Sequence, residues 1–489
     1  MTRINSNVSS MIARNQLART NDDLAVRLQR LSTGLKINRG ADNPAGLIVS
    51  ERLRNEIQAV GQAVDNIERA SNVIATTESA LQEINDLLIS MKSLVVEAAN
   101  TGAFSKEEIR ANQLQIDSAV QSITRISNTA SFAGLKMLNG SLDYIVENAT
   151  ASQISDISIF GANFGTNTSI PVTVEVLASA QNAQLFIGGN SNPGVPGTFL
   201  SSVTFTVAGT RGTESFQFIS GTTMAQAINQ INSRSDATGV SASLVSGADP
   251  SSGIVLSSTE FGSDAFVSVE RQRDGDFFNT LDAPGGTAIV RDTGQDVLAI
   301  VNGNLALGRG SLVSLNTSSL QLELQLTDAT ATSGLGTEYT FDITGGGAIY
   351  QIGPGVNSAQ QVGFGIQSVA ASNLGNSTAG FLSDIISDGD FSLVKGQQRQ
   401  ASDILDAAID QVSILRGRLG AFERNTLDTT ARSAQVALEN LTASESRIRD
   451  TDFAEETAAL TRAQILQQAG TQTLSLANNT AQSVLSLLQ

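Results

Sequence analysis

The chain has 489 residues and a net charge of −17, with 47 acidic against 30 basic residues. This acidity argues against a nucleic-acid partner, because such binding needs clustered cations that displace counterions. Histidine, cysteine and tryptophan are absent, which excludes disulfides, thiolate nucleophiles, imidazole bases and the usual zinc sites. No apolar run approaches the roughly 20 residues that cross a bilayer. We therefore expect no enzyme, no cofactor, no metal site and no membrane partner.

An amphipathic stripe marks the start of the chain. Its apolar residues recur at helical spacing, although less regularly than in a coiled coil. A lone helix of this kind is marginally stable in water and usually needs a partner, so we expect an assembly element. The stripe contains Ile4, Val8, Met11, Leu17, Leu24, Leu28, Leu31 and Leu35.

The next expected element is a long helix that begins at Pro44, after the capping candidates Asp42 and Asn43. Its apolar residues recur in steps of three, four and seven, which predicts a coiled-coil seam over about six heptads. Ser71 and Glu78 interrupt that seam. The core positions are Leu53, Ile57, Val60, Val64, Ile67, Ile74, Leu81, Ile84 and Leu88, followed by Met91 and Val95.

A second helix follows the break at Gly102. Ser105 and Glu108 have the spacing of a capping box. Ile109, Ile116, Val120 and Ile123 form one stripe along this helix. We expect it to lie antiparallel to the first.

The middle of the chain changes to alternating β-forming residues separated by Gly, Ser, Thr, Asn and Asp. Residues 203–207 and 215–219 are expected to pair as strands, with a short helix over 225–231. Further strands are expected at 241–245, 253–256 and 266–269. Two Asp-Gly-Asp sequences, 274–276 and 388–390, lack the spacing of a calcium loop, and we interpret them as solvated turns.

A third coiled-coil segment appears near the C-terminus, where the apolar residues step by three and four. The pattern slips by one or two residues before it resumes at Leu438, Leu441 and Ile448. A final, less regular stripe then runs to the end of the chain. The coiled-coil core positions are Leu405, Val412, Leu415, Leu419 and Phe422, and those of the final stripe are Phe453, Leu460, Leu466, Val484, Leu485 and Leu488.

These elements predict an α+β fold in which the chain folds back on itself. Long antiparallel coiled-coil helices from both termini form a bundle core, because three amphipathic helices need each other to bury their seams. A mainly-β outer region is inserted between them.

Both ends of the chain resemble bacterial flagellins. The similarity rests on residues 31–47 (LSTGLKINRGADNPAGL), on the acidic-aromatic stretch 451–456 (TDFAEE) and on residues 479–489 (NTAQSVLSLLQ). The segment 221–232 and the glycines that follow it are similar to a module that recurs in flagellins and hook-associated proteins. The resemblance implies a structural subunit that polymerises into the flagellar filament, a helical propeller for swimming. It also implies the divisions of the chain, which are an N-terminal inner-core helix (1–43), two halves of the outer core (44–165 and 346–450), a surface-exposed β-rich insertion (166–345) and a C-terminal inner-core helix (451–489).

The same resemblance implies partners and a location. It implies a homopolymer with other flagellin subunits, contacts with the flagellar cap and hook-associated proteins, an export chaperone, and passage through the flagellar secretion apparatus without a cleaved signal peptide to an extracellular filament. Junction contacts are expected from residues 31–47 and 447–453, with Arg39, Asp42, Arg447, Arg449 and Asp450 as candidates for charge pairs. The alternative is a hook-filament junction protein, which has similar ends.

The resemblance also bears on innate immune recognition. Some flagellins contact the vertebrate receptor through an arginine and a leucine on the first core helix and a glutamate on the next. The matching residues are Ser90, Leu94 and Gln115, so Leu94 alone keeps the pattern. We therefore expect weak receptor activation, with Lys92 and Glu97 as the charged neighbours that could compensate in part.

Overall fold

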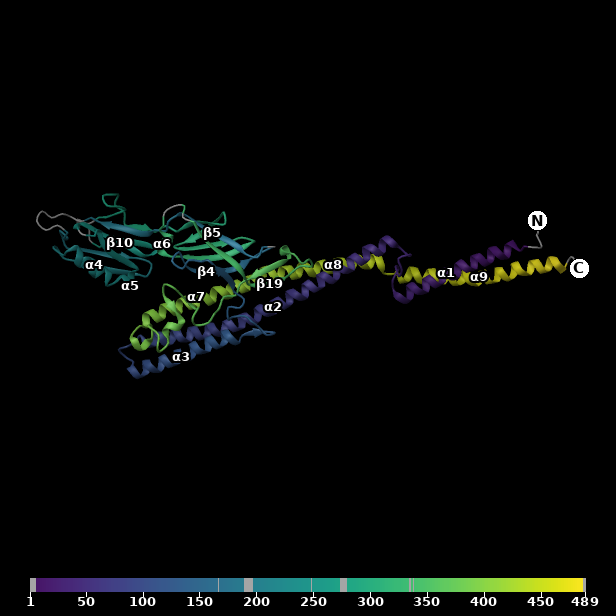
Figure 1. Cartoon of the computed structure of the whole chain (residues 1–489), viewed down its shortest axis with the longest axis horizontal. Helices are drawn as coiled ribbons and strands as arrows, with labels where there is room; N and C mark the ends of the chain where they lie inside the picture. Colours follow the sequence, from purple (N-terminus) through teal and green to yellow (C-terminus); the bar gives the residue numbers. More distant parts are fainter. Residues whose placement is uncertain are drawn as a thin grey trace. The chain divides into compact units, whose positions relative to one another are not determined.

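The computed structural model describes residues 6–165, 167–188, 197–247, 249–272, 279–333, 336 and 338–486, with side chains up to residue 479. The chain forms two compact units. The first contains residues 1–70, 351–356 and 424–489, and the second contains 71–350 and 357–423. Figure 1 traces the elements along the chain. Within the described residues, every helix is too short or too polar to span a bilayer.

The helices dominate both ends of the sequence. They are α1 (Val8–Thr33), α2 (Pro44–Ala98), α3 (Lys106–Thr129), α4 (Met224–Asn232), α5 (Ser235–Thr238), α6 (Asp328–Ala331), α7 (Gln398–Phe422), α8 (Asp428–Arg449) and α9 (Phe453–Ser486), with 3₁₀ turns η1 (Ser358–Gln360), η2 (Leu382–Ile385) and η3 (Leu393–Lys395) and a π turn η4 (Glu423–Leu427).

The strands fill the middle. They are β1 (Ser131–Phe132), β2 (Leu135–Lys136), β3 (Tyr144–Glu147), β4 (Ile154–Ala162), β5 (Ile170–Ala178), β6 (Asn182–Ile187), β7 (Val203–Ala208), β8 (Thr213–Phe218), β9 (Val240–Ser246), β10 (Asp249–Phe261), β11 (Phe266–Arg271), β12 (Thr280–Leu281), β13 (Arg291–Thr293), β14 (Leu298–Val301), β15 (Asn304–Arg309), β16 (Leu312–Asn316), β17 (Leu320–Leu326), β18 (Glu338–Gly346), β19 (Ala348–Gln351), β20 (Gln361–Phe364), β21 (Gly375–Asn376) and β22 (Gly380–Phe381).

The starts of α2 and α3 follow the sequence signals. Pro44 is the first residue of α2, and the Asn43 side chain accepts a hydrogen bond from the Gly46 backbone N–H at 2.9 Å. Ser105 and Glu108 form the reciprocal capping box at the start of α3. Both capping predictions are confirmed, because each cap satisfies a backbone N–H that has no partner inside the helix.

The slip in the C-terminal pattern has a structural cause. Between α7 and α8 the backbone forms one π turn, η4, in which Leu427 is fully buried. A π turn inserts extra residues into the helix and rotates the residues that follow it. This turn explains why the apolar spacing breaks after Phe422 and resumes in α8.

The largest sheet has eight antiparallel strands in the order β3-β18-β5-β14-β15-β16-β17-β4. Alternate residues of its strands point into one core, in which Val174, Ala299 and Leu324 are fully buried. The sheet begins before residue 166 and ends after residue 345, because β3, β4 and the last residue of β18 belong to it. The strand-rich region therefore reaches beyond the range expected for the insertion.

A second core lies between two four-stranded sheets, β12-β6-β10-β9 and β13-β11-β7-β8. The predicted pairing of 203–207 with 215–219 is confirmed by β7 and β8, in which Phe205 lies opposite Phe216. The predicted helix over 225–231 is α4, which buries Met224, Ala227 and Ile231. The predicted strands at 241–245, 253–256 and 266–269 lie in β9, β10 and β11.

The two Asp-Gly-Asp sequences have different outcomes. Residues 274–276 lie outside the described residues. At 388–390 the Gly389 N–H donates to the Ile386 carbonyl, as expected of a turn, and Asp390 lies 3.5 Å from Lys395.

Candidate assembly surface

In the first unit, α1 and α9 pair in antiparallel orientation along most of their length. The Asn7 side chain donates to the Ala477 carbonyl at 2.8 Å, Gln467 donates to Asn21 at 2.8 Å, and Arg27 reaches Glu456. As residue numbers rise along α1, those of their partners fall along α9. The two ends of the chain therefore form one helical pair.

Small residues allow the two helices to approach closely. Thr20 of α1 and Ala463 of α9 are the most buried residues in the middle of the pair. A side chain added at Gly470 would come within 3.2 Å of Leu17 Cδ1, closer than most methyl contacts in proteins. The pair is therefore narrow and leaves the larger apolar residues around its edge.

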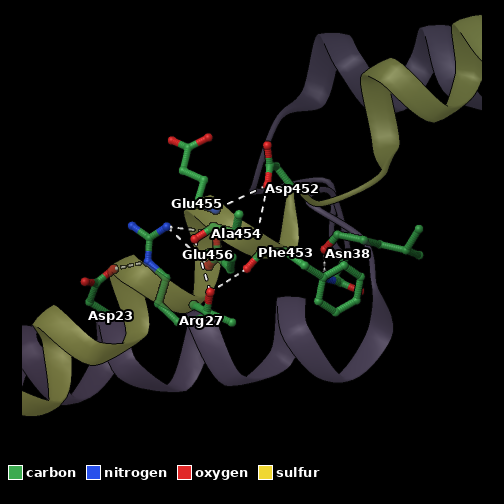
Figure 2. A network of polar contacts seen from close by, with 10 residues as sticks. Asp23, Arg27, Asn38, Asp452, Phe453, Ala454, Glu455 and Glu456 are labelled. Atoms are coloured by element: carbon green, nitrogen blue, oxygen red, sulfur yellow. Dashed lines mark hydrogen bonds and ion pairs between the residues drawn. The ribbon is translucent and has the colours of Figure 1, made fainter.

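An ion pair joins the start of α9 to α1 (Figure 2). Arg27 Nη1 lies 3.2 Å from both carboxylate oxygens of Glu456, and its Nε lies 3.2 Å from Asp23 Oδ1. Burial lowers the pKa of Arg27, but Glu456 and Asp23 outweigh that effect and raise it, so the guanidinium stays charged. Glu456 lies within the stretch 451–456 noted in the sequence, but its partner 429 residues away could not be located by spacing.

The segments 31–47 and 447–453 meet through their backbones. Leu35 forms a β-bridge with Asp450, the Lys36 N–H donates to the Arg449 carbonyl at 2.7 Å, and the Thr451 N–H donates to the Gly34 carbonyl at 2.9 Å. Gly34 ends α1 with a φ of 72°, a left-handed conformation that glycine adopts readily. These bonds hold the end of α1 beside the start of α9.

Side chains fix the same junction. Asp452 accepts hydrogen bonds from the Ala454 and Glu455 N–H groups at 2.8 and 3.2 Å and so caps α9 (Figure 2). Asp42 accepts from the Arg39 and Asn38 N–H groups, and these bonds lower its pKa.

Three more of the candidate charged residues have side-chain partners within the first unit. The Arg39 side chain donates to Gln29 at 3.0 Å, Arg449 donates to Glu51 at 2.9 Å, and Ser446 donates to Asp450 at 2.6 Å.

The helical pair leaves several large apolar side chains exposed. Val8, Met11 and Leu28 of the N-terminal stripe are 54, 62 and 48% exposed, and Phe453 and Leu466 of the C-terminal stripe are 56 and 52% exposed. Leu17, Leu24, Leu31, Leu35 and Leu460 are half-buried. Ile4 and Leu488 lie outside the described residues, as do the side chains of Val484 and Leu485.

The second unit contains a polar row between α2 and α7. Ser71 donates to Glu423, Glu78 lies 3.7 Å from Arg416, and Lys92 lies 2.6 Å from Asp406. On α2 these residues are separated by multiples of seven, so they share one helical face, and their partner numbers fall as theirs rise. The two interruptions noted in the seam, Ser71 and Glu78, thus have polar partners that set the antiparallel register.

The apolar seam lies beside this row. Leu53 and Ile57 are half-buried, as is Phe422, whose ring centroid lies 4.9 Å from that of Phe364. The other predicted core positions are buried, namely Val60, Val64, Ile67, Ile74, Leu81, Ile84, Leu88, Leu405, Val412, Leu415 and Leu419.

The receptor-related positions lie on α2 and α3. Leu94 is half-buried, and Ser90 and Gln115 are exposed. Lys92 is engaged with Asp406 and Ser402 within the unit. Among the described residues, His, Cys, Asp and Glu form no group of three that could hold a metal ion.

Comparison with known proteins identifies the family of this chain. The bacterial flagellin N-terminal helical region matches residues 4–143, the bacterial flagellin C-terminal helical region matches 402–488, and the flagellin hook IN motif matches 204–260. The chain belongs to the bacterial flagellins. The segments that match the two helical regions contain α1, α2, α3, α8, α9 and most of α7.

Flagellin relatives align over nearly the full chain. The B-type flagellin of Pseudomonas aeruginosa is 28% identical and the flagellin of Salmonella rubislaw is 26% identical, each over 99% of both chains. Among solved structures, flagellar hook-associated protein-3 from Legionella pneumophila is 10% identical, with 81% of this chain and 98% of that chain covered, at a TM-score of 0.31.

This flagellin is therefore a structural subunit of the extracellular flagellar filament, as its sequence predicts. No finding favours the hook-filament junction alternative. The predicted α+β fold, with long terminal helices and an inserted β-rich region, is confirmed.

Proposed function

We propose that copies of this flagellin polymerise through the exposed apolar residues of the α1–α9 pair. The observation that carries this proposal is the exposure of Val8, Met11, Leu28, Phe453 and Leu466 on two helices that are already paired. Large apolar side chains left exposed along one helical pair favour an interaction surface. A growing filament end would supply the missing partners and bury these residues.

Two substitutions test the proposal. Met11→Asp and Leu466→Asp each place a charge at an exposed position, so the subunit should keep its helix content while polymerisation on sheared filament seeds is lost. Asn15→Asp adds the same charge at an exposed polar position of α1 and should polymerise normally. Electron microscopy of seeded samples gives the result, and normal filaments from both apolar variants would contradict the proposal.

Deletion of residues 454–489 is a stronger form of the same test. The deletion removes α9 from its second residue onward together with Glu456, so α1 loses its partner. We expect no growth on filament seeds. Normal growth would show that α9 is not an assembly element.

We assign the expected divisions on the same basis. Residues 1–43 and 451–489 form the inner core, 44–165 and 346–450 form the outer core, and the inserted region is exposed on the filament surface. The strand positions favour wider limits for the insertion, near residues 144 and 364, since these limits contain the whole eight-stranded sheet.

The export route and the further partners follow from family membership. We infer passage through the flagellar secretion apparatus, with an export chaperone covering the apolar terminal helices before assembly. The cap and the hook-associated proteins are the proposed neighbours at the two ends of the filament. Co-purification of the chaperone with full-length chain, and its loss on deletion of 454–489, would support this route.

A further inference from the structure

One apolar surface of the second unit has no role in the subunit described so far. We call it the outer leucine patch, and it comprises Leu298 and Ile300 on β14, Leu305 and Leu307 on β15, and Leu312 on β16. Leu305 and Leu307 are 66 and 74% exposed, and Leu298 is 39% exposed. The alternate residues Ala299, Val301, Ala306 and Val313 point to the other face and are buried in the core.

Strand register brings these residues together. Ile300 lies opposite Leu305, and Leu307 lies opposite Ser314, two residues from Leu312. Neighbours of this kind are about 5 to 8 Å apart on one face of a sheet. β15 is hydrogen-bonded on both sides, so the leucines do not mark an unpaired edge.

Other strands of the sheet have polar residues on the corresponding face. Thr173 of β5, Thr340 of β18 and Gln321 of β17 alternate with buried apolar residues. The leucines of β14 and β15 therefore depart from the pattern of their own sheet. A grouped departure of this kind indicates a contact surface.

Charge limits what the patch can contact. Residues 144–364 contain 18 acidic and 6 basic residues, so this region of one copy repels the same region of another. The five patch residues are uncharged. Glu175 of β5 lies opposite Ile300 on the same face. Arg309 of β15 is paired with Asp264 at 2.9 Å. Contact between two copies is therefore less unfavourable through these leucines, which add no charge of their own.

The size of the patch favours a second copy over a freely diffusing partner. Five side chains provide much less than the roughly 800 Å² per partner of a stable complex. Copies held in one polymer are at an effective concentration of about millimolar, at which so small a contact can form. We propose that the outer leucine patch contacts the strand-rich region of a neighbouring copy within the filament, an inference that depends on the filament function.

Repeated application of one helical operation makes the contact heterologous. The patch of one copy then meets a different surface of the next copy and cannot meet itself. The contact can therefore be observed only in filaments. In free subunits the patch should be accessible to solvent.

Cysteine labelling tests the contact directly, because the chain has no cysteine. Leu307→Cys is labelled with a maleimide in free subunits and in seeded filaments, and Thr213→Cys, at an exposed position of β8, is the control. We expect labelling at position 307 to slow at least tenfold on polymerisation while labelling at position 213 is unchanged. Equal rates at position 307 in both states, or slow labelling in the free subunit, would overturn the inference.

This experiment distinguishes failure of the proposed contact from failure of polymerisation. If the unsubstituted protein fails to form filaments, the proposed function fails. If filaments form but the cysteine at position 307 is labelled as fast as in free subunits, only the proposed contact is wrong. A second variant, Leu305→Ser with Leu307→Ser, should still form filaments, but the label at a third site, Leu298→Cys, should then react as fast as in free subunits.

Discussion

At the scale of single residues, the α1–α9 pair depends on polar side chains at partly buried positions. Glu456 is 8% exposed at its side chain, and Arg27 is its counter-charge. A buried carboxylate that loses its partner keeps the free-energy cost of desolvation, and no favourable ion pair offsets that cost. The ion pair therefore fixes which part of α1 lies beside α9.

Replacement of Arg27 by methionine should destabilise the helical pair by about 1 to 3 kcal/mol, the usual cost of leaving a buried polar group without its partner. The expected readouts are a lower melting temperature of filaments and a higher critical concentration. Glu455→Gln is the matched control, since Glu455 is exposed on the same turn of α9. A filament with Arg27→Met that melts like the unsubstituted one would show that the ion pair is dispensable.

Tyr350 provides a prediction about pH in the second unit. Burial raises its pKa to about 12, and its ring lies 6.1 Å from that of Phe422. The neutral phenol is favoured in the folded state, so the stabilisation is complete below pH 10 and is lost as the pH rises through 12. Absorbance titration of the three tyrosines should show a group near 12 that is absent in Tyr350→Phe, and titration of every tyrosine near 10 would contradict this.

At the scale of elements, one position in the polar row between α2 and α7 has no polar partner in the described part of the chain. Asn85 has the same heptad position as Ser71, Glu78 and Lys92, but its side-chain oxygen is buried without a hydrogen-bond partner. Among the described residues, no side chain of α7 donates a hydrogen bond to this amide oxygen.

Asn85→Leu should therefore stabilise the second unit by about 1 kcal/mol, because the cost of an unsatisfied buried amide disappears. Ser71→Ala should have the opposite effect, since it removes the donor to Glu423. Midpoints of urea unfolding compare the two variants with the unsubstituted protein. A lower midpoint for Asn85→Leu would show that this amide has a role in the bundle.

The same elements show what the sequence could predict. The starts of α2 and α3 were predictable because caps are local, and the slip after Phe422 was visible as a change of spacing. The partners of Ser71, Glu78 and Glu456 were not predictable, since each lies more than 300 residues away. The strands β3 and β4 were missed as members of the sheet, because their pairing partners β17 and β18 are far along the chain.

At the scale of the whole molecule, the strand-rich region enters and leaves the helical part at one place. The Ile366 N–H donates to the Leu142 carbonyl at 2.9 Å, so the ends that flank residues 143–365 are adjacent. A short linker can therefore replace the whole region without moving these ends.

We expect a chain in which a Gly-Ser linker replaces residues 144–364 to fold and polymerise on filament seeds, because the seam residues of α2 and α7 remain. The matched comparison removes only residues 170–340, which leaves β3 and β4 in place but deletes β5 and β14 to β17 and cuts β18 short. Strands without partners expose unpaired backbone groups and promote aggregation. Light scattering and electron microscopy should therefore show filaments for the longer deletion and aggregates for the shorter one. If the longer deletion fails to fold while the shorter one assembles, the limits near 144 and 364 are wrong and the edge strands belong with the helices.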